Sequence, residues 1–321
     1  MRSARGRAAW LLALVLALTA AVNALAYRHA HAFTRFASTG RPTPKPEALS
    51  VAEKLHALFA GPVLLRPTNR RTPEAVGLAY ERRTFVTGDG VALEAWLVPA
   101  AQPRGLVVMF HGYADSKASL LAEARALHEL GWSTLLVDFR GSGGSAGDET
   151  TLGFREAADV AAAFDHARSL SARPVVLFGA SMGAAAVLKA MAEYRLDADA
   201  LLLESPFDRM LTAVAHRCHA VGLPAFPAAQ LLVFWGGWQQ HFDGFRHNPV
   251  DYAASVDRPT LLMQGEADER VSVDEAKAIF DRLRGPKELK LFPGVRHMSL
   301  VRARPAEWAA AVETFLEHAS G

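Results

Sequence analysis

The stretch "LFGASMGAAAV", from Leu177 to Val187, places a serine between two glycines at the end of an apolar run. The preceding "PVVLF" is typical of a buried strand, and the following "AAAVLKAMAEY" is typical of a helix. A serine on a strand–turn–helix with small neighbours is held on a strained turn, where its hydroxyl can act as a nucleophile. We therefore predict that Ser181 is a nucleophile.

A serine hydroxyl needs a general base, and the base needs a carboxylate that orients it. Asp268 lies in "QGEADERV", just after an expected strand at 259–264, and His297 lies in "FPGVRHMSL", after an expected strand at 287–292. Open α/β sheets build their sites at the carboxyl ends of such strands. The order serine, acid, histidine therefore predicts a triad of Ser181, Asp268 and His297. Three other acidic residues are alternatives for the acid: Glu266, Glu269 and Asp208.

The rest of the chain alternates between strands and helices. Strands are expected in "YERRTFVT", "VALEAWLV" and "GLVVMFHG", and at 133–139, 174–180, 199–204, 259–264 and 287–292. Helices are expected at 117–130, 152–170, 182–194, 272–284 and 305–318. An antiparallel hairpin followed by strand–helix units predicts an α/β fold, with a mostly parallel eight-stranded sheet and helices on both faces.

The alternation breaks once, between Pro206 and Val250. This stretch is long for a simple connection and rich in Phe and Trp, so we expect a small helical cap at about 206–250. Its aromatic side chains have two possible roles. They either line an acyl pocket or form the core of the cap itself.

Residues 1–27 combine a basic start with an apolar run. The run from Ala8 to Ala26 has 19 residues with two polar interruptions. This length lies between a signal-peptide core of about 7–15 residues and a membrane-spanning helix of about 20. We expect an uncleaved membrane anchor, with cleavage near Ala26 and secretion as the alternative. The arginines of "MRSARGR" favour a cytoplasmic N-terminus and an exported domain.

The region after the anchor has prolines at 42, 44 and 46, which favour an extended chain. We expect residues 28–47 to form a linker and residues 48–321 to form one large domain, which includes the cap.

Composition excludes several other classes of protein. Residues 1–50 hold seven Lys and Arg against one acidic residue, while the rest of the chain carries 28 basic and 32 acidic residues. The body therefore has no basic excess that would favour nucleic acid as a partner. Cys218 is the one cysteine, and neither a C-x-x-C pair nor an H-E-x-x-H helix occurs, so we expect no metal site. "GSGGSAG" at 141–147 does not open a helix directly, so we expect no dinucleotide cofactor.

In combination, several motifs resemble those of the α/β-hydrolase superfamily: "HGYADSK", "DFRGSGGSAG", "GASMG", "LESPFD", "GEADERV" and "GVRHMSL". The chain looks most like bacterial membrane-associated serine hydrolases related to the S33 aminopeptidase-like and esterase groups. The resemblance covers about residues 78–318. It implies Ser181 as nucleophile, Asp268 as orienting acid and His297 as general base. The pattern G-x-x-D favours Asp268 over the other acidic residues.

An oxyanion hole needs backbone N–H groups aimed at the developing charge. We expect one from Met182, directly after the nucleophile, and the other from Tyr113 in "HGYADS". His111, at the end of the preceding strand, is expected to support this loop and not to take part in catalysis.

The sequence thus predicts a serine hydrolase that cleaves carboxylic esters through an acyl-enzyme, without metal or organic cofactor. Its expected partners are a small ester or acyl substrate and a membrane. One alternative is an aminopeptidase or amidase acting on short peptides, which needs an acidic site such as Glu204 for the substrate amine. Another is a non-catalytic, membrane-tethered binding protein, although such a protein has no need of all three triad residues.

Overall fold

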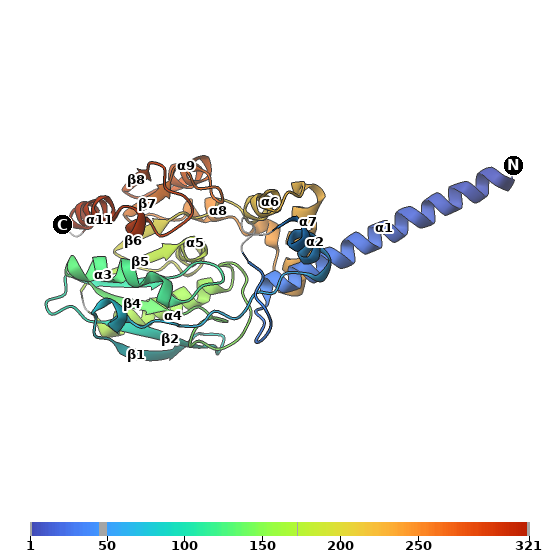
Figure 1. Cartoon of the computed structure of the whole chain (residues 1–321). Coiled ribbons are helices and arrows are strands. Elements are labelled where there is room, and N and C mark those ends of the chain that lie inside the picture. Colours follow the sequence, from blue (N-terminus) through green and yellow to red (C-terminus); the bar gives the residue numbers. More distant parts are fainter. Residues whose placement is uncertain (1, 45–49, 172, 320–321) are drawn as a thin grey trace.

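The computed structural model describes residues 2–44, 50–171 and 173–319. Its centre is one sheet of eight strands in the order β1-β2-β4-β3-β5-β6-β7-β8 (Figure 1). The strands are β1 (Glu81–Val86), β2 (Ala92–Val98), β3 (Leu106–Phe110), β4 (Ser133–Val137), β5 (Val175–Ala180), β6 (Ala200–Glu204), β7 (Thr260–Gly265) and β8 (Lys287–Phe292). The pairs β1–β2 and β2–β4 are antiparallel, and all others are parallel. The predicted mostly parallel, eight-stranded α/β fold is confirmed.

The central strands are apolar on both faces because helices cover both. In β3, Val108 and Phe110 face one core, and Val107 and Met109 face the other. The first core is closed by α4 (Glu156–Leu170), α5 (Met182–Tyr194), α8 (Pro249–Ala253) and α9 (Val273–Arg282). The second is closed by α3 (Leu121–Glu129), α10 (Leu300–Ala303) and α11 (Pro305–Ala319). Continuous apolar runs in the sequence are therefore strands buried between two layers.

Two expected helices begin later than their patterns suggest. The helix expected at 152–170 starts at Glu156, because its carboxylate accepts hydrogen bonds from the N–H groups of Thr151 and Gly153 and so holds the preceding turn. The helix expected at 117–130 is divided into a 3₁₀ turn, η3 (Lys117–Leu120), and α3. Boundaries of this kind depend on side-chain contacts and not on periodicity.

The insertion between β6 and β7 is helical. It contains α6 (Met210–Ala220), α7 (Ala225–Gln239), the short η4 (Gly244–Arg246) and α8. Helices α6 and α7 pack on each other at the carboxyl end of the sheet, beside the first helix of the chain (Figure 1).

That first helix, α1, spans Arg2–Thr34 and projects far from the domain (Figure 1). It ends seven residues beyond the boundary expected at residue 27, because its last turns pack on α7. Trp235 Nε1–H donates to Asn23 at 3.2 Å, and Gln239 Nε2–H donates to the Tyr27 carbonyl at 2.8 Å. The linker expected from residue 28 therefore begins after Thr34.

The segment after α1 leads back to the domain through α2 (Val51–Ala60) and the 3₁₀ turn η2 (Pro73–Val76). Ser50 and Glu53 form a capping box at the start of α2. The end of the expected linker, residues 45–47, and the first two residues of the expected domain, 48–49, lie outside the described residues. The N–H of Phe36 donates to the Asp148 carbonyl, so the chain between α1 and α2 is attached to the domain surface.

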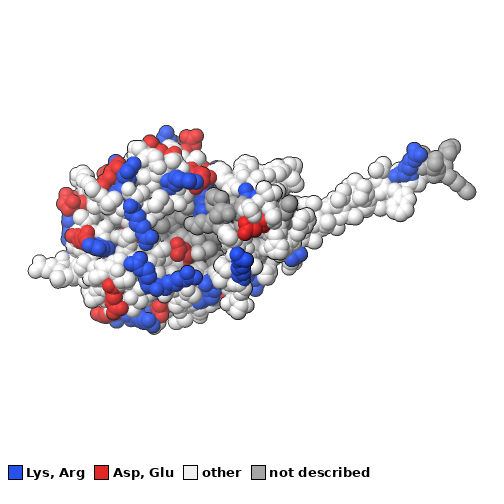
Figure 2. Space-filling model, in the orientation of Figure 1, with Lys and Arg blue, Asp and Glu red and all other residues white. Residues whose placement is uncertain are grey.

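Part of α1 has the length and composition of a membrane span. Gly6–Thr34 has a mean hydropathy of 2.2 in its most apolar window, and this window is not buried in the domain. A signal sequence passes the same test. Figure 2 shows charged residues distributed over the domain, whereas the projecting part of α1 lacks them up to its N-terminal end.

Candidate active site

Ser181 lies on a sharp turn between β5 and α5. Its backbone has φ of 53° and ψ of −112°, a conformation that residues with a side chain rarely adopt. The turn is held by the Ser181 N–H, which donates to the Glu204 carbonyl at 2.7 Å. Ser181 therefore has the strained backbone expected from the sequence.

The two glycines beside Ser181 allow α5 to approach the sheet closely. A Cβ on Gly183 would lie 2.3 Å from the Phe110 carbonyl oxygen, and a Cβ on Gly179 would lie 2.6 Å from the backbone of Ala184. Both distances are too short for any side chain. In this chain, close packing of α5 on the sheet therefore requires both glycines of the pattern G-x-S-x-G.

Asp268 and His297 form a hydrogen-bonded pair. His297 lies on the loop after β8, and Asp268 lies on the loop after β7. The distance from His297 Nδ1 to Asp268 Oδ2 is 2.7 Å. Burial opposes ionisation of Asp268, but the hydrogen bond and charge of His297 outweigh it and lower the pKa of this carboxyl. The backbone N–H groups of Arg270 and Val271 also donate to Asp268, at 2.8 and 3.0 Å. The geometry is that of a carboxylate orienting an imidazole.

Two backbone N–H groups near Ser181 are free to donate. Met182 is the first residue of α5, and neither its N–H nor that of Tyr113 bonds to another group in the part of the chain that the structure describes. Gly112 brings the second loop close, since a Cβ there would lie 3.7 Å from the Ser181 Cβ. This arrangement suits an oxyanion hole.

His111 supports this loop, as the sequence analysis expected. It is fully buried; its Nδ1 lies 2.8 Å from the Gly112 carbonyl, and its Nε2 accepts from the Phe139 N–H at 3.1 Å. With both ring nitrogens occupied, His111 has no position from which to act on a substrate.

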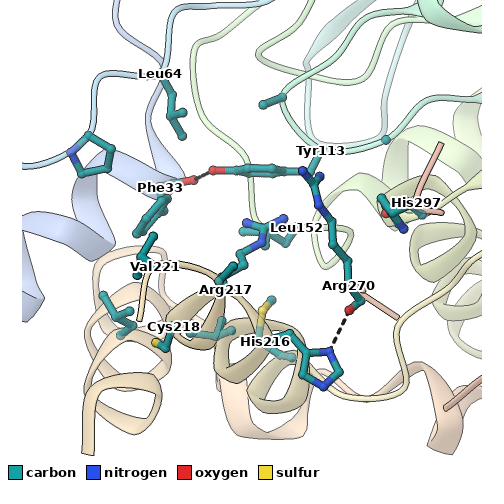
Figure 3. A pocket seen from close by; sticks show the side chains of 18 of the residues that line it. Phe33, Leu64, Tyr113, Leu152, His216, Arg217, Cys218, Val221, Arg270 and His297 are labelled. Atoms are coloured by element: carbon teal, nitrogen blue, oxygen red, sulfur yellow. Dashed lines mark hydrogen bonds between the residues drawn. The ribbon is translucent and has the colours of Figure 1, made fainter. Parts of the chain in front are cut away.

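A cavity of about 1350 Å³ connects these groups. Ser181, His297 and Tyr113 line one part of it. Figure 3 shows Tyr113 and His297 at the cavity. Apolar side chains from α1, α2, the segment after α2 and the cap line much of the rest, among them Phe33, Leu58, Leu64, Val221, Leu223 and Leu232. Its size and apolar wall suit a ligand with an acyl chain.

The last turns of α1 form part of the cavity wall, which the sequence analysis missed. His29, Ala30, Phe33 and Thr34 all line the cavity. The Tyr113 hydroxyl donates to the Phe33 carbonyl at 2.6 Å, which joins α1 to the proposed oxyanion loop. The apolar run gave no signal for this role, because an anchor and a cavity wall both need apolar residues.

Only some of the aromatic side chains of the cap line the cavity or lie in the core of the cap, the two roles expected from the sequence. Phe242 lines the cavity, and Phe207 is buried. Others face outward: Phe226 is 75% exposed, Trp238 61% and Phe234 49%. Trp235 packs edge-on against Tyr27 of α1, with ring centroids 5.4 Å apart. Most of these aromatic rings therefore lie at the surface of the cap and not in its interior.

The other acidic candidates have different surroundings. Glu269 is ion-paired with Arg296 at 2.7 Å, Glu266 is exposed, and Asp208 lies 3.7 Å from Arg209. Glu204 lines the cavity and accepts a hydrogen bond from Trp308 Nε1–H at 2.6 Å. Burial and the nearby Glu123 raise the pKa of Glu204 to about 8.

Metal and dinucleotide sites find no support in the described residues. Within residues 2–44, 50–171 and 173–319, no group of three or more His, Cys, Asp or Glu side chains is placed to hold a metal ion. The glycine-rich loop at 141–147 packs on Asp138, whose carboxylate accepts from the Gly144 N–H at 2.8 Å. A Cβ on Gly143 would overlap this carboxylate, so these glycines serve a tight turn.

Comparisons with known proteins agree with this fold. Residues 101–254 match the family model described as serine aminopeptidase, S33. An uncharacterized protein of Mycobacterium tuberculosis is 33% identical over 239 residues, covering 72% of this chain and 78% of the relative. A monoacylglycerol lipase of Mycolicibacterium smegmatis is 26% identical over 247 residues, covering 66% of this chain and 87% of the relative.

Among solved structures, an esterase of Pyrococcus furiosus has the same fold. Its TM-score is 0.67 at 24% identity, with 80% of this chain and 97% of the esterase covered. With the family model that matches residues 101–254 and the 33% identical relative, the chain belongs to the α/β-hydrolase superfamily. Its activity is not defined by this membership, because one fold supports many reactions.

Proposed function

We propose that this protein is a membrane-anchored serine hydrolase that cleaves carboxylic esters of acyl chains. The observation that carries the proposal is the strained Ser181 in one cavity with His297, which is hydrogen-bonded to Asp268. Met182 and Tyr113 supply the proposed oxyanion hole. Each part has the role that serine-dependent acyl transfer requires.

In the first half-reaction, Ser181 Oγ attacks the ester carbonyl carbon while His297 Nε2 takes the hydroxyl proton. The carbonyl π electrons move to oxygen, and the N–H groups of Met182 and Tyr113 stabilise the resulting oxyanion. The C–O bond to the alcohol then breaks, and His297 gives its proton to the leaving oxygen. An acyl-enzyme on Ser181 is left.

In the second half-reaction, His297 takes a proton from water, whose oxygen attacks the acyl carbonyl. The tetrahedral intermediate collapses, the bond to Ser181 Oγ breaks, and His297 returns the proton to it. The acid is released. Asp268 keeps the imidazole in one orientation and stabilises its charged form throughout.

The two buried carboxyl groups that line the cavity, Glu123 and Glu204, do not favour a substrate with a free amine. A site for a substrate amine needs a carboxylate, but the pKa of Glu204 is raised to about 8, so this group is protonated near neutral pH. Burial likewise raises the pKa of Glu123. The apolar wall contributed by α1 and the cap suits an acyl chain.

The proposed membrane attachment rests on both ends of α1. About 20 residues of helix cover the roughly 30 Å apolar core of a bilayer. Trp10 and Tyr27 stand 17 residues apart, so each lies near one membrane boundary, where aromatic residues are common. Four exposed aromatic rings lie on α2 and α7, the two helices that contact the later turns of α1: Phe59, Phe226, Phe234 and Trp238. We call these four side chains the apolar collar.

We propose that the apolar collar rests on the membrane surface and that α1 is retained as an anchor. Cleavage near Ala26 would remove Asn23, which accepts the hydrogen bond from Trp235, and would expose cap surface. The basic start places the N-terminus in the cytoplasm and the domain outside. The mass of the mature N-terminus in the native host tests this: a chain starting near residue 27 would contradict it.

The activity is tested with p-nitrophenyl esters of increasing acyl length on the full-length chain in detergent. Full length is needed because α1 lines the cavity. We expect hydrolysis that Ser181→Ala abolishes, with an optimum at a medium or long chain. Cleavage of aminoacyl anilides without ester hydrolysis would favour the peptidase alternative. Absence of both, with no fluorophosphonate labelling of the folded chain, would favour a binding protein.

A further inference from the structure

Arg217 extends from the last turns of α6 into the cavity, beside the proposed oxyanion loop. Its guanidinium carbon lies 4.5 Å from the centroid of the Tyr113 ring. Figure 3 shows the two side chains together, with Phe33 and His297 on opposite sides of the cavity. A cation thus stands between the apolar wall and the proposed catalytic groups.

Among the described residues, Arg217 lacks the carboxylate partner that other arginines of the chain have. Arg35 pairs with Glu149 at 2.6 Å, and Arg209, at the start of α6, lies 3.7 Å from Asp208. For Arg217, no carboxylate oxygen of the described residues lies within 4 Å. Its side chain is partly buried, and the Tyr113 ring gives the guanidinium a cation–π contact but no carboxylate or phosphate oxygen.

The acidic side chains that line the cavity have partners other than Arg217. Glu269 pairs with Arg296, Glu123 accepts from Ser299 Oγ–H at 2.6 Å, and Glu204 accepts from Trp308. Asp115 accepts from the Ser116 N–H at 2.9 Å. Burial lowers the pKa of Arg217, the nearby Tyr113 opposes this change, and the nearby Arg270 adds to it. Even so, a guanidinium stays charged at neutral pH.

A guanidinium facing an open cavity is well suited to bind carboxylate or phosphate, because its N–H groups match two oxygens of either group. We propose that Arg217 binds an anionic group, a carboxylate or a phosphate, that the ester substrate itself carries. This inference rests on the proposed ester hydrolysis and names its substrate class: acyl esters with a negative charge near the ester bond. The charge must be near, because Tyr113 supplies both the ring against Arg217 and a proposed oxyanion donor.

Two pairs of substrates test this subsite and separate its two sources of charge. The first pair is mono-p-nitrophenyl adipate against p-nitrophenyl hexanoate, with a carboxylate on the acyl side. The second is a lysophosphatidic acid against the monoacylglycerol of the same chain, with a phosphate on the alcohol side. The measured quantity is the ratio of kcat/KM for the anionic ester to kcat/KM for the neutral one.

In the full-length chain, Arg217→Met should lower this ratio about 10- to 100-fold for at least one pair, as expected for a lost charged hydrogen bond. The pair affected identifies the side that carries the charge. Arg217→Lys keeps the charge without the planar fork and should recover part of the ratio. Arg209→Met removes the same charge outside the cavity and is the matched control. An equal ratio in Arg217→Met and Arg209→Met would overturn the proposal.

If the Arg217→Met variant does not fold, the proposed anion subsite is tested by inhibition of the wild-type chain. Hexyl phosphate or adipate should inhibit hydrolysis of p-nitrophenyl hexanoate at least tenfold more strongly than hexanol, and salt should weaken that inhibition. Equal inhibition by the three compounds would overturn the proposal. Failure of the proposed function is separate: it would appear as hydrolysis that Ser181→Ala leaves intact.

Discussion

The neighbouring strands β6 and β7 each lead to an acidic residue, and the two carboxyl groups differ in charge. Glu204 ends β6, is buried near Glu123 and accepts one side-chain hydrogen bond, from Trp308. Asp268 follows β7 and accepts hydrogen bonds from several donors: the N–H groups of Arg270 and Val271, Gln264 Nε2 and His297 Nδ1. The pKa of Glu204 is raised to about 8, whereas that of Asp268 is lowered.

The comparison teaches that donors, and not position at a strand end, decide which carboxyl is ionised. Both groups are largely removed from water, and burial alone raises the pKa of either one. Only Asp268 has enough donors to overcome this effect. Only Asp268 is therefore equipped to orient a histidine that becomes charged during the reaction.

The largest expected effect is that of Asp268→Asn. An amide in place of the carboxylate loses the charge that stabilises His297 and favours the wrong tautomer, so kcat/KM for an ester should fall by about 10⁴-fold. The matched change Glu204→Gln should leave kcat/KM within about threefold, because the wild-type group is already neutral. Equal losses in the two variants would break the comparison.

A smaller effect is expected when Glu204 loses its donor. Trp308 is fully buried, and Trp308→Phe removes the N–H while keeping an aromatic ring. The free energy of unfolding should fall by about 1–3 kcal/mol, which corresponds to a Tm lower by roughly 2–12 °C. Trp96→Phe is the control, since the buried Trp96 Nε1 has no partner among the described residues. Thermal melts in which both variants lose equal stability would contradict a specific role for this hydrogen bond.

The smallest expected effect is a change in how stability depends on pH. An acid whose pKa is raised by folding binds its proton more tightly in the folded chain. Glu204 therefore makes the chain less stable as pH rises from the pKa of this group in the unfolded chain, 4.5, to its pKa in the folded chain, about 8. Asp159, whose pKa burial raises to about 7, contributes in the same window. Asp268 does not, since its stabilising effect is lost only as pH falls below its unfolded value of 3.8.

Glu204→Gln removes one of these contributions. The Tm of the Gln variant minus the Tm of the wild type should be larger at pH 9 than at pH 6. Each kcal/mol of difference in stability should shift Tm by roughly 2–4 °C. The check is a pair of thermal melts at the two pH values. A constant difference between variant and wild type would show that Glu204 has an ordinary pKa.

Much of the fold was predictable because its strands and helices have strong patterns. The helix at 182–194 and the strand at 287–292 have the expected bounds. Placing Ser181, Asp268 and His297 at one end of the sheet needed only the order of strands and the position of each residue after its strand. Their roles stay predictions until they are measured.

What the sequence could not supply depends on contacts between distant segments. The bond between Tyr113 and Phe33 joins residues 80 positions apart, and the bond between Trp235 and Asn23 joins residues 212 positions apart. Neither contact changes the local pattern. The charge state of Glu204 depends on Glu123 and Trp308, and that of Asp268 depends in part on His297, all of them distant in the sequence. Periodicity carries no information on such donors.

The central claim is that the pair of His297 and Asp268 activates Ser181. Labelling of the full-length chain with a fluorophosphonate, followed by mass spectrometry of its peptides, tests it most directly. The account predicts one adduct, on Ser181, formed much more slowly in Asp268→Asn and at the wild-type rate in Glu204→Gln. An adduct on another serine, or equal labelling in Asp268→Asn and wild type, would contradict it.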